Sequence, residues 1–136
     1  TDRGLYQWDE AIQYSVTELA QGVCPDGWHI PTDAEQNTLD QSLNDTTCDA
    51  NRIGAWGCAN AGTKLQTGGT SGFEGLLAGD RNTNGSFYYQ GSYAGFWSSS
   101  VSGSDAWHRV LFTGNATVGR GHDDRANGFS VRCLQD

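Results

Sequence analysis

The chain has 136 residues, a formal net charge of −8, and only 36% hydrophobic and 18% charged residues. This length fits one domain, residues 1–136. The acidic balance excludes nucleic acid and an anionic membrane surface as partners, because both require clustered Lys and Arg. No stretch approaches the roughly 18 apolar residues of a membrane span, so direct membrane insertion is not expected. Because the sequence begins at Thr1, we expect a mature fragment or an excised domain.

The first 43 residues predict two short strands and two helices. Residues 5–8 favour a strand, and residues 9–20 favour a helix because apolar side chains recur there at helical spacing. A second strand is expected over residues 27–30 and a second helix over residues 33–43.

A capping box marks the start of the second helix. Thr32 and Glu35 stand three residues apart, so each side chain can accept a hydrogen bond from the other residue's backbone N–H. The turn-forming residues Asn44 and Asp45 are expected to follow the end of this helix.

The rest of the chain predicts a long loop and then antiparallel strands. Residues 44–72 are expected to be the loop, after which Gly, Asn and Ser separate short apolar runs typical of strands. Helices followed by strands indicate an α+β domain rather than an alternating one. The expected strands span residues 73–77, 86–89, 95–98, 106–112, 116–118 and 129–134.

Aromatic side chains are expected to carry much of the burial. The chain has five Trp, five Tyr and five Phe, and each ring can bury roughly 150–250 Å². Alternate residues of the strand over 106–112 face opposite sides, so one set must be buried. The rings expected in the core are Trp28, Phe96, Phe112 and Phe129.

Four cysteines predict two disulfide bonds. Of the three possible pairings we favour Cys24–Cys133 with Cys48–Cys58. A zinc site is the alternative, but it requires close Cys or His pairs that the sequence lacks. Disulfides form in oxidising compartments, so we expect a secreted or cell-surface protein.

Six segments together resemble a known bacterial family. In chain order they are LYQWDEA, CPDGWHIPTDAE, AGTKL, GFEGLLAGDRNTNGSF, FWSSS and GFSVRC. In these segments the chain is similar to the Fibrobacter succinogenes major paralogous domain, which resembles the C-type lectin-like and formylglycine-generating-enzyme-like fold. Gln36 departs from the pattern, because the family usually has Trp at this position.

The resemblance implies a twisted antiparallel sheet flanked by two helices, with long loops and with the two ends joined by the Cys24–Cys133 bridge. It also implies a ligand-binding face built from the long loops and from the strands after residue 78. The family is widespread in bacterial surface and secreted proteins, often as a module.

Motifs for catalysis are weak, and we expect no enzyme. The run from Gly91 to Gly95 only half resembles the nucleophile elbow of a serine hydrolase. The serines at 98–100 have no evident base beside them in sequence. The formylglycine-generating relatives use a pair of reactive cysteines, whereas all four cysteines here are better explained as bridges.

An oxygen-rich stretch provides weak candidates for calcium: Asp80, Asn82 and Asn84. The alternative is a turn stabilised by these side chains. Sugar-binding C-type lectins use Glu-Pro-Asn or Gln-Pro-Asp with Trp-Asn-Asp, and neither pattern occurs here. We therefore expect no required cofactor, with calcium as an optional one.

Candidate ligand-binding residues lie in the second half of the chain, where aromatic residues alternate with Arg, Asn and Ser as in recognition surfaces. The alternative for the aromatic rings is that they are buried in the core. The alternative for residues 119–125 is that they form a solvated hairpin tip. The candidates are Tyr88, Tyr89, Tyr93, Trp97, Trp107, Arg109, Arg120, His122, Asp123, Asp124 and Arg125.

These features predict a non-catalytic extracellular recognition module that binds a glycan or a protein or peptide ligand, as in adhesion. One alternative is the variable ligand-binding protein of a diversity-generating retroelement, with a variable region from about Trp97 to Arg125. Another is a structural tip or minor-pilin module. In each case we expect the domain to belong to a larger surface protein or pilus.

Overall fold

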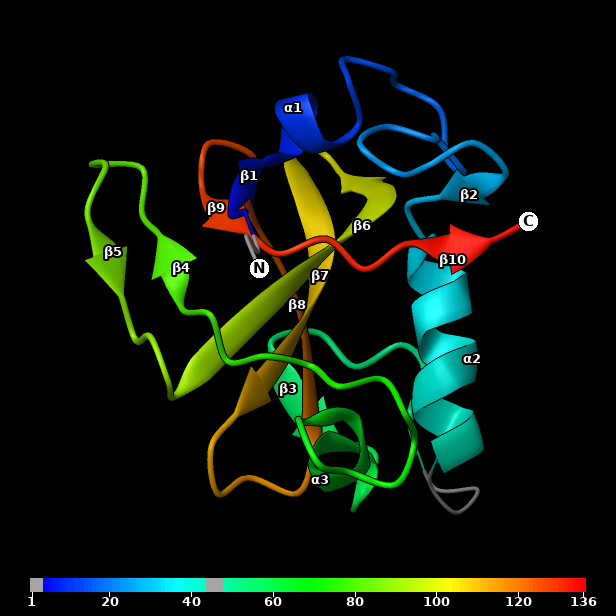
Figure 1. Cartoon of the computed structure of the whole chain (residues 1–136), viewed down its shortest axis with the longest axis vertical. Helices are drawn as coiled ribbons and strands as arrows, with labels where there is room; N and C mark the ends of the chain where they lie inside the picture. The colour runs from blue at the N-terminus through cyan, green and yellow to red at the C-terminus, as the bar shows by residue number, and fades with distance from the viewer. Residues whose placement is uncertain (1–3, 44–47) are drawn as a thin grey trace.

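A four-stranded antiparallel sheet in the order β3-β8-β7-β6 runs through the middle of the molecule (Figure 1). The computed structural model describes residues 4–43 and 48–136. We call this sheet the central sheet. Its strands are β3 (Ala55–Gly57), β6 (Tyr93–Ser102), β7 (Asp105–Phe112) and β8 (Val118–Asp124).

Two smaller antiparallel sheets flank the central one. The first has the order β1-β9-β4-β5, and its β4–β5 hairpin projects on the side of the molecule opposite α2 (Figure 1). The second pairs β10 with β2, placing Leu134 opposite His29. The strands are β1 (Tyr6–Gln7), β2 (Trp28–His29), β4 (Asp80–Arg81), β5 (Phe87–Tyr88), β9 (Gly128–Phe129) and β10 (Leu134–Gln135).

Three helices complete the described fold: α1 (Trp8–Ala11), α2 (Asp33–Leu43) and α3 (Ala61–Leu65). The capping box of α2 is present as predicted. The Glu35 N–H donates to Thr32 Oγ1 at 3.1 Å, and the Thr32 N–H donates to Glu35 Oε2 at 2.8 Å. The predicted start and end of α2 are confirmed, and the chain is α+β as expected.

The first predicted helix is wrong beyond Ala11. Gln13 and Tyr14 adopt left-handed backbone conformations, and the Val23 N–H donates to the Ala11 carbonyl at 2.9 Å. The chain therefore turns back on itself, and Val16 is 85% exposed instead of lying on a buried helix face.

Three further predictions of secondary structure need correction. The expected loop over 44–72 contains β3 and α3, and residues 73–77 form no strand of their own. The expected strand over 129–134 is divided between β9 and β10, because its two ends pair with different sheets. The predicted turn at Asn44 and Asp45 lies outside the described residues.

The core consists of two clusters. One surrounds the buried rings of Trp8, Trp97 and Phe129, and the other includes Phe96 and Leu111. Burial of Phe96 and Phe129 is as predicted. The prediction is wrong for Trp28 and Phe112, which are 37% and 39% exposed. Trp28 belongs to the two-residue strand β2, which pairs only with β10 among the described strands, and Phe112 is the last residue of β7. Neither side chain is therefore covered by another layer of the fold.

The two disulfides join Cys24 to Cys133 and Cys48 to Cys58, the pairing that the sequence favoured. Two disulfides are consistent with a secreted or extracellular protein. None of the helices in the described part of the chain is long and apolar enough to span a bilayer.

Candidate functional site

The face of the central sheet turned away from α2 carries an open groove of about 360 Å³. Side chains alternate along β8, so Gly119, Gly121 and Asp123 face the groove. Arg120, the residue between the two glycines, instead directs its side chain to Asp33 of α2. We call this feature the sheet groove.

Two glycines form the floor of the sheet groove. A Cβ atom at Gly121 would lie 3.4 Å from His108 Nε2, and a Cβ atom at Gly119 would lie 3.1 Å from Val110 Cβ. Because neither residue has a side chain, the surface of β8 stays open between its neighbours. A ligand can therefore approach the backbone of the strand closely.

Aromatic and aliphatic side chains flank this floor. Trp56 of β3 lies opposite Gly119 and is 46% exposed, with the exposed Ile53 beside it. Tyr93 of β6 also lines the groove. Its ring centroid is 6.2 Å from that of Tyr89, which is 63% exposed.

The aromatic row continues from Tyr89 to Tyr88, with ring centroids 6.0 Å apart. Tyr88, Tyr89 and Tyr93, all predicted as ligand-binding residues, are therefore next to one another. Tyr93 lies in the groove and the other two lead away from it along the β4–β5 hairpin.

Asp123, another predicted ligand-binding residue, carries a half-exposed carboxylate in the groove. Its Oδ2 is 3.0 Å from His108 Nε2. The imidazole of His108 is buried between Trp97 and Phe129, with ring centroids 5.8 and 4.8 Å away. His108 Nδ1 has no hydrogen-bond partner among the described residues. The buried imidazole thus holds one oxygen of Asp123 at the groove.

A second carboxylate acts on the same region. Burial, together with the charge of Asp123, raises the pKa of Asp80 despite a backbone hydrogen bond that lowers it. The buried Oδ1 of Asp80 has no hydrogen-bond partner within the described ranges. Burial and the charges of Asp123 and Asp80 likewise raise the pKa of Tyr93, so its phenol remains a neutral donor. The carboxyl groups of Asp123 and Asp80 therefore both act on the Tyr93 phenol.

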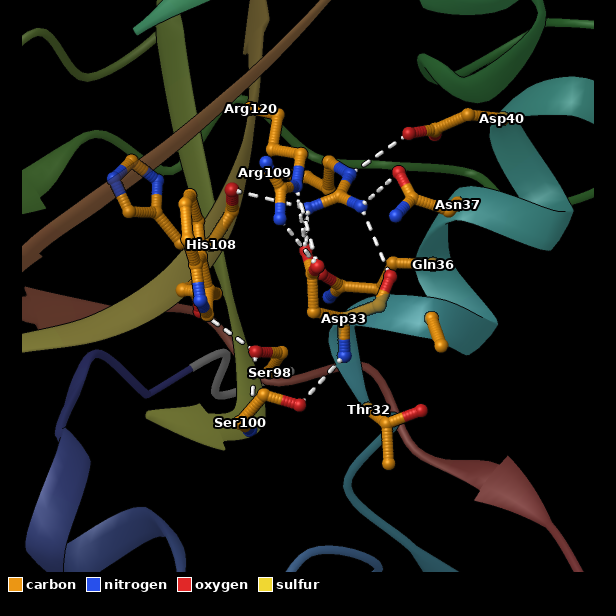
Figure 2. A network of polar contacts seen from close by, with 12 residues as sticks. Thr32, Asp33, Gln36, Asn37, Asp40, Ser98, Ser100, His108, Arg109 and Arg120 are labelled. Carbon is orange, nitrogen blue, oxygen red and sulfur yellow. Dashed lines mark hydrogen bonds and ion pairs between the residues drawn. The ribbon is translucent and has the colours of Figure 1, made fainter. Parts of the chain in front are cut away.

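The opposite face of the central sheet holds a buried ionic network, shown in Figure 2. The carboxylates of Asp33 and Asp40 point from α2 toward guanidinium groups of the sheet. Asp33 binds Arg109 Nη1 and Arg120 Nη2, each at 2.7 Å. Asp40 Oδ2 binds Arg109 Nε at 2.8 Å and Arg52 Nη2 at 2.9 Å. His108 is next to Arg109 on β7, but its imidazole points to the opposite side of the strand, away from this network (Figure 2).

Three predicted ligand-binding residues are therefore parts of the interior. Arg109 and Arg120 are buried because the carboxylates of α2 neutralise them, and their side chains are not presented to solvent. Trp97 is fully buried, with its ring centroid 4.5 Å from that of Phe129 and its Nε1 donating to the Tyr6 carbonyl.

Of the other predicted residues, His122 lines the sheet groove, whereas Trp107, Asp124 and Arg125 lie near the surface away from it. Trp107 is half-buried, with the Arg120 guanidinium 3.7 Å from its ring centroid and His122 stacked edge-on against it. Arg125 lies over the ring of Trp8, and Asp124 accepts the Ala126 N–H in the following turn. Residues 118–124 form strand β8 rather than a hairpin tip.

Two of the calcium candidates take part in hydrogen bonds within a turn. Asn84 Oδ1 accepts the Ser86 N–H and Asn82 Oδ1 accepts the Thr83 hydroxyl, both within the β4–β5 hairpin. Asp80 lies at the start of the hairpin, opposite Tyr88. Across the described part of the chain, no group of three or more His, Cys, Asp or Glu side chains is placed to hold a metal ion.

A second cavity, of about 260 Å³, lies between α2 and the central sheet. Its walls are largely apolar and include Leu39, Phe73, Phe96 and Leu111. Gln36 also lines it, and the buried Oε1 of this residue has no hydrogen-bond partner among the described residues. Some of these walls belong to the second core cluster, but the exposed Arg132 and Leu134 also line the cavity, so it opens to the surface.

Sequence reasoning missed Trp56 and Ile53 as site residues, because it placed them in a structureless loop. It did not select His108 either. The alternation of Gly119, Gly121 and Asp123 was a usable signal for one open face of a strand. No local signal shows that β3 would pair with β8 and bring Trp56 to that face.

The fold and the site define a disulfide-bonded α+β domain with an open groove that is both aromatic and acidic. The chain belongs to the Fibrobacter succinogenes major domain family, whose model matches residues 2–135. No curated protein and no solved structure matches the chain.

Proposed function

We propose that this domain is a non-catalytic, extracellular recognition module of the C-type lectin-like type, and that it binds a glycan or a protein or peptide ligand in the sheet groove. One observation carries the proposal: exposed Trp56 and half-buried Tyr93 flank a floor made of glycine. Aromatic rings beside an open backbone offer stacking surface and hydrogen-bonding groups together.

The arrangement favours binding over catalysis. The groove lining includes the Asp123 carboxylate and two histidines: the imidazole of His108 is buried and packed between Trp97 and Phe129, and that of His122 is hydrogen-bonded to Asp105. A nucleophile–base pair within hydrogen-bonding reach would be the basis for proposing covalent catalysis, and the groove lining contains no Ser, Cys or Lys. The proposed mode of binding requires no metal.

We rank the retroelement alternative lower. A variable region from Trp97 to Arg125 would include the buried Trp97, Arg109 and Arg120, whose replacement would disturb the core and the ionic network. The tip or minor-pilin alternative places the same groove against another subunit and is one case of a protein ligand. A secreted or cell-surface location, as part of a larger surface protein or pilus, is included in the proposal.

A glycan and peptide array, probed with and without EDTA, tests this function. We expect at least one ligand class to bind, and to bind equally with EDTA present. Trp56→Ala should then lower its affinity by about tenfold or more, as truncation of an aromatic hot spot does. Trp28→Ala is the matched control, because Trp28 is also a strand Trp and is 37% exposed but lies outside the groove.

Absence of any ligand in both conditions would sink the recognition proposal. Equal losses for Trp56→Ala and Trp28→Ala would place the binding site elsewhere. Binding that disappears only with EDTA would show that calcium is required after all.

A further inference from the structure

We infer that the sheet groove takes a basic side chain, and that the ligand is a peptide or protein that presents an arginine guanidinium to Asp123 between aromatic walls. This inference rests on the proposed function and names the chemical class of its ligand. It starts from a charge that the described structure leaves unbalanced.

In the described part of the chain, Asp123 and Asp80 lack the guanidinium partners that Asp33 and Asp40 have. Asp33 and Asp40 on the opposite face are each bound by two guanidinium groups. In residues 4–43 and 48–136, by contrast, neither Asp123 nor Asp80 has an Arg or Lys within ion-pair distance, and Asp123 contacts only His108.

The surroundings of Arg120 provide an example of a bound guanidinium group within this domain. Arg120 donates two hydrogen bonds to Asp33, from Nε at 3.0 Å and from Nη2 at 2.7 Å, while its guanidinium lies 3.7 Å from the Trp107 ring centroid. A carboxylate beside an aromatic face suits the planar, forked geometry of Arg. Asp123 and the groove rings, Tyr93 and Trp56, offer the same two components on the other face of β8.

The floor and the electrostatics favour the same ligand. Gly121 adds no side chain of its own beside the His108 imidazole, so a ligand side chain can lie over this glycine next to Asp123. The net charge of −8 attracts cationic partners over a longer range. A neutral sugar would stack on the rings equally well but would leave the two carboxylates uncompensated.

Amide chemical shifts of Gly119 and Gly121 can measure this preference directly by NMR titration. The probes are N-acetyl-arginine methylamide and its neutral, nearly isosteric counterpart N-acetyl-citrulline methylamide, with the lysine analogue as a third arm. We expect the arginine probe to bind the wild-type protein about fivefold more tightly than the citrulline probe. This is the ratio of dissociation constants expected when one probe forms a partly exposed ion pair and the other does not.

Asp123→Asn should abolish this ratio, whereas Asp124→Asn should preserve it. Both variants change the net charge equally at adjacent positions, but Asp124 lies on the other face of β8. In Asp123→Asn the amide oxygen can still accept from His108, and dispersed amide resonances verify that the variant is folded.

Equal affinity for arginine and citrulline, no response to arginine, or an unchanged ratio in Asp123→Asn would each overturn the inference. A ligand on the array that depends on Trp56 but not on Asp123 would overturn only this inference and leave the recognition function standing. Tighter binding of the lysine probe than of the arginine probe would overturn the choice of guanidinium.

Discussion

Asp40 joins two distant parts of the chain through one oxygen atom. Its Oδ2 accepts from Arg52 and from Arg109, and its side chain is almost completely buried. Removing one member of such a network leaves buried charges uncompensated, which costs more than the intact network contributes.

Asp40→Asn should therefore lower the free energy of unfolding by about 3–5 kcal/mol, measured by urea titration. The exposed Asp26 provides the control, because among the described residues its carboxylate accepts a hydrogen bond only from Gln21. Asp26→Asn should change stability by no more than about 0.5 kcal/mol. Similar losses for the two variants would mean that the network does not hold α2 to the sheet.

Asp33 should make stability depend on acid pH. Burial raises the pKa of its carboxyl, but the hydrogen bonds and charges of Arg120 and Arg109 outweigh this and hold the pKa below its usual value. A lowered folded-state pKa gives stability that is present above the unfolded-state pKa and is lost as pH falls through the folded-state pKa.

The stability difference between wild type and Asp33→Asn should thus be constant near neutral pH and shrink below about pH 4. Urea titrations at several pH values measure it. A difference that grows on acidification would contradict the assigned direction of the shift.

Among the elements, α2 depends most clearly on its local sequence. Thr32 supplies the capping hydroxyl, while Thr38 lies exposed within the helix and donates to the Ala34 carbonyl. Thr32→Ala should cost about 1 kcal/mol of stability, whereas Thr38→Ala should cost little or increase stability, because Ala favours the helix. Thermal unfolding of both variants compares them, and an equal effect would remove the capping box as the cause of the helix boundary.

Local signals account for α2 but not for α1. Of the apolar residues that predict a helix over 9–20, Ala11, Ile12 and Ala20 are buried, whereas Val16 and Leu19 remain exposed. The backbone hydrogen bond from Val23 to Ala11 is a contact that periodicity cannot anticipate. Tertiary contacts therefore decide where this helix ends.

The candidate site could be predicted only in part, for the same reason. Tyr93 and Asp123 were identified from their chemistry, and β8 alternation puts Asp123 on the face of the two glycines. Arg109 and Arg120 resemble surface residues in sequence, and only the packing of α2 shows that they are buried. Trp56 reaches the groove through a strand pairing over more than 60 residues of chain, as its register with Gly119 shows.

At the scale of the whole molecule, the Cys24–Cys133 bridge constrains most of the chain. It spans 109 positions, whereas Cys48–Cys58 spans 10. In the chain-entropy model the long bridge contributes about 4–5 kcal/mol and the short one about 3 kcal/mol or less. The double variant Cys24→Ala/Cys133→Ala should therefore be less stable than Cys48→Ala/Cys58→Ala in urea titrations, and the reverse order would contradict a mainly entropic role.

The long bridge and the buried ionic network both lie away from the sheet groove. The bridge packs into the core cluster around Trp97, and the network lies on the α2 side of the sheet. The groove therefore lies on a framework held from the opposite side, and variants at Trp56 or Asp123 should alter binding more than folding.

Mapping a bound array ligand by amide chemical shifts tests the position of the binding site most directly. With the sheet groove as the site, the largest changes should fall on Gly119, Gly121 and Trp56, and the changes at the two glycines should be much smaller in Trp56→Ala at the same ligand concentration. Changes centred on Leu39 and Phe73 beside the apolar cavity, or on Trp107 and Arg125, would contradict the groove as the site of recognition.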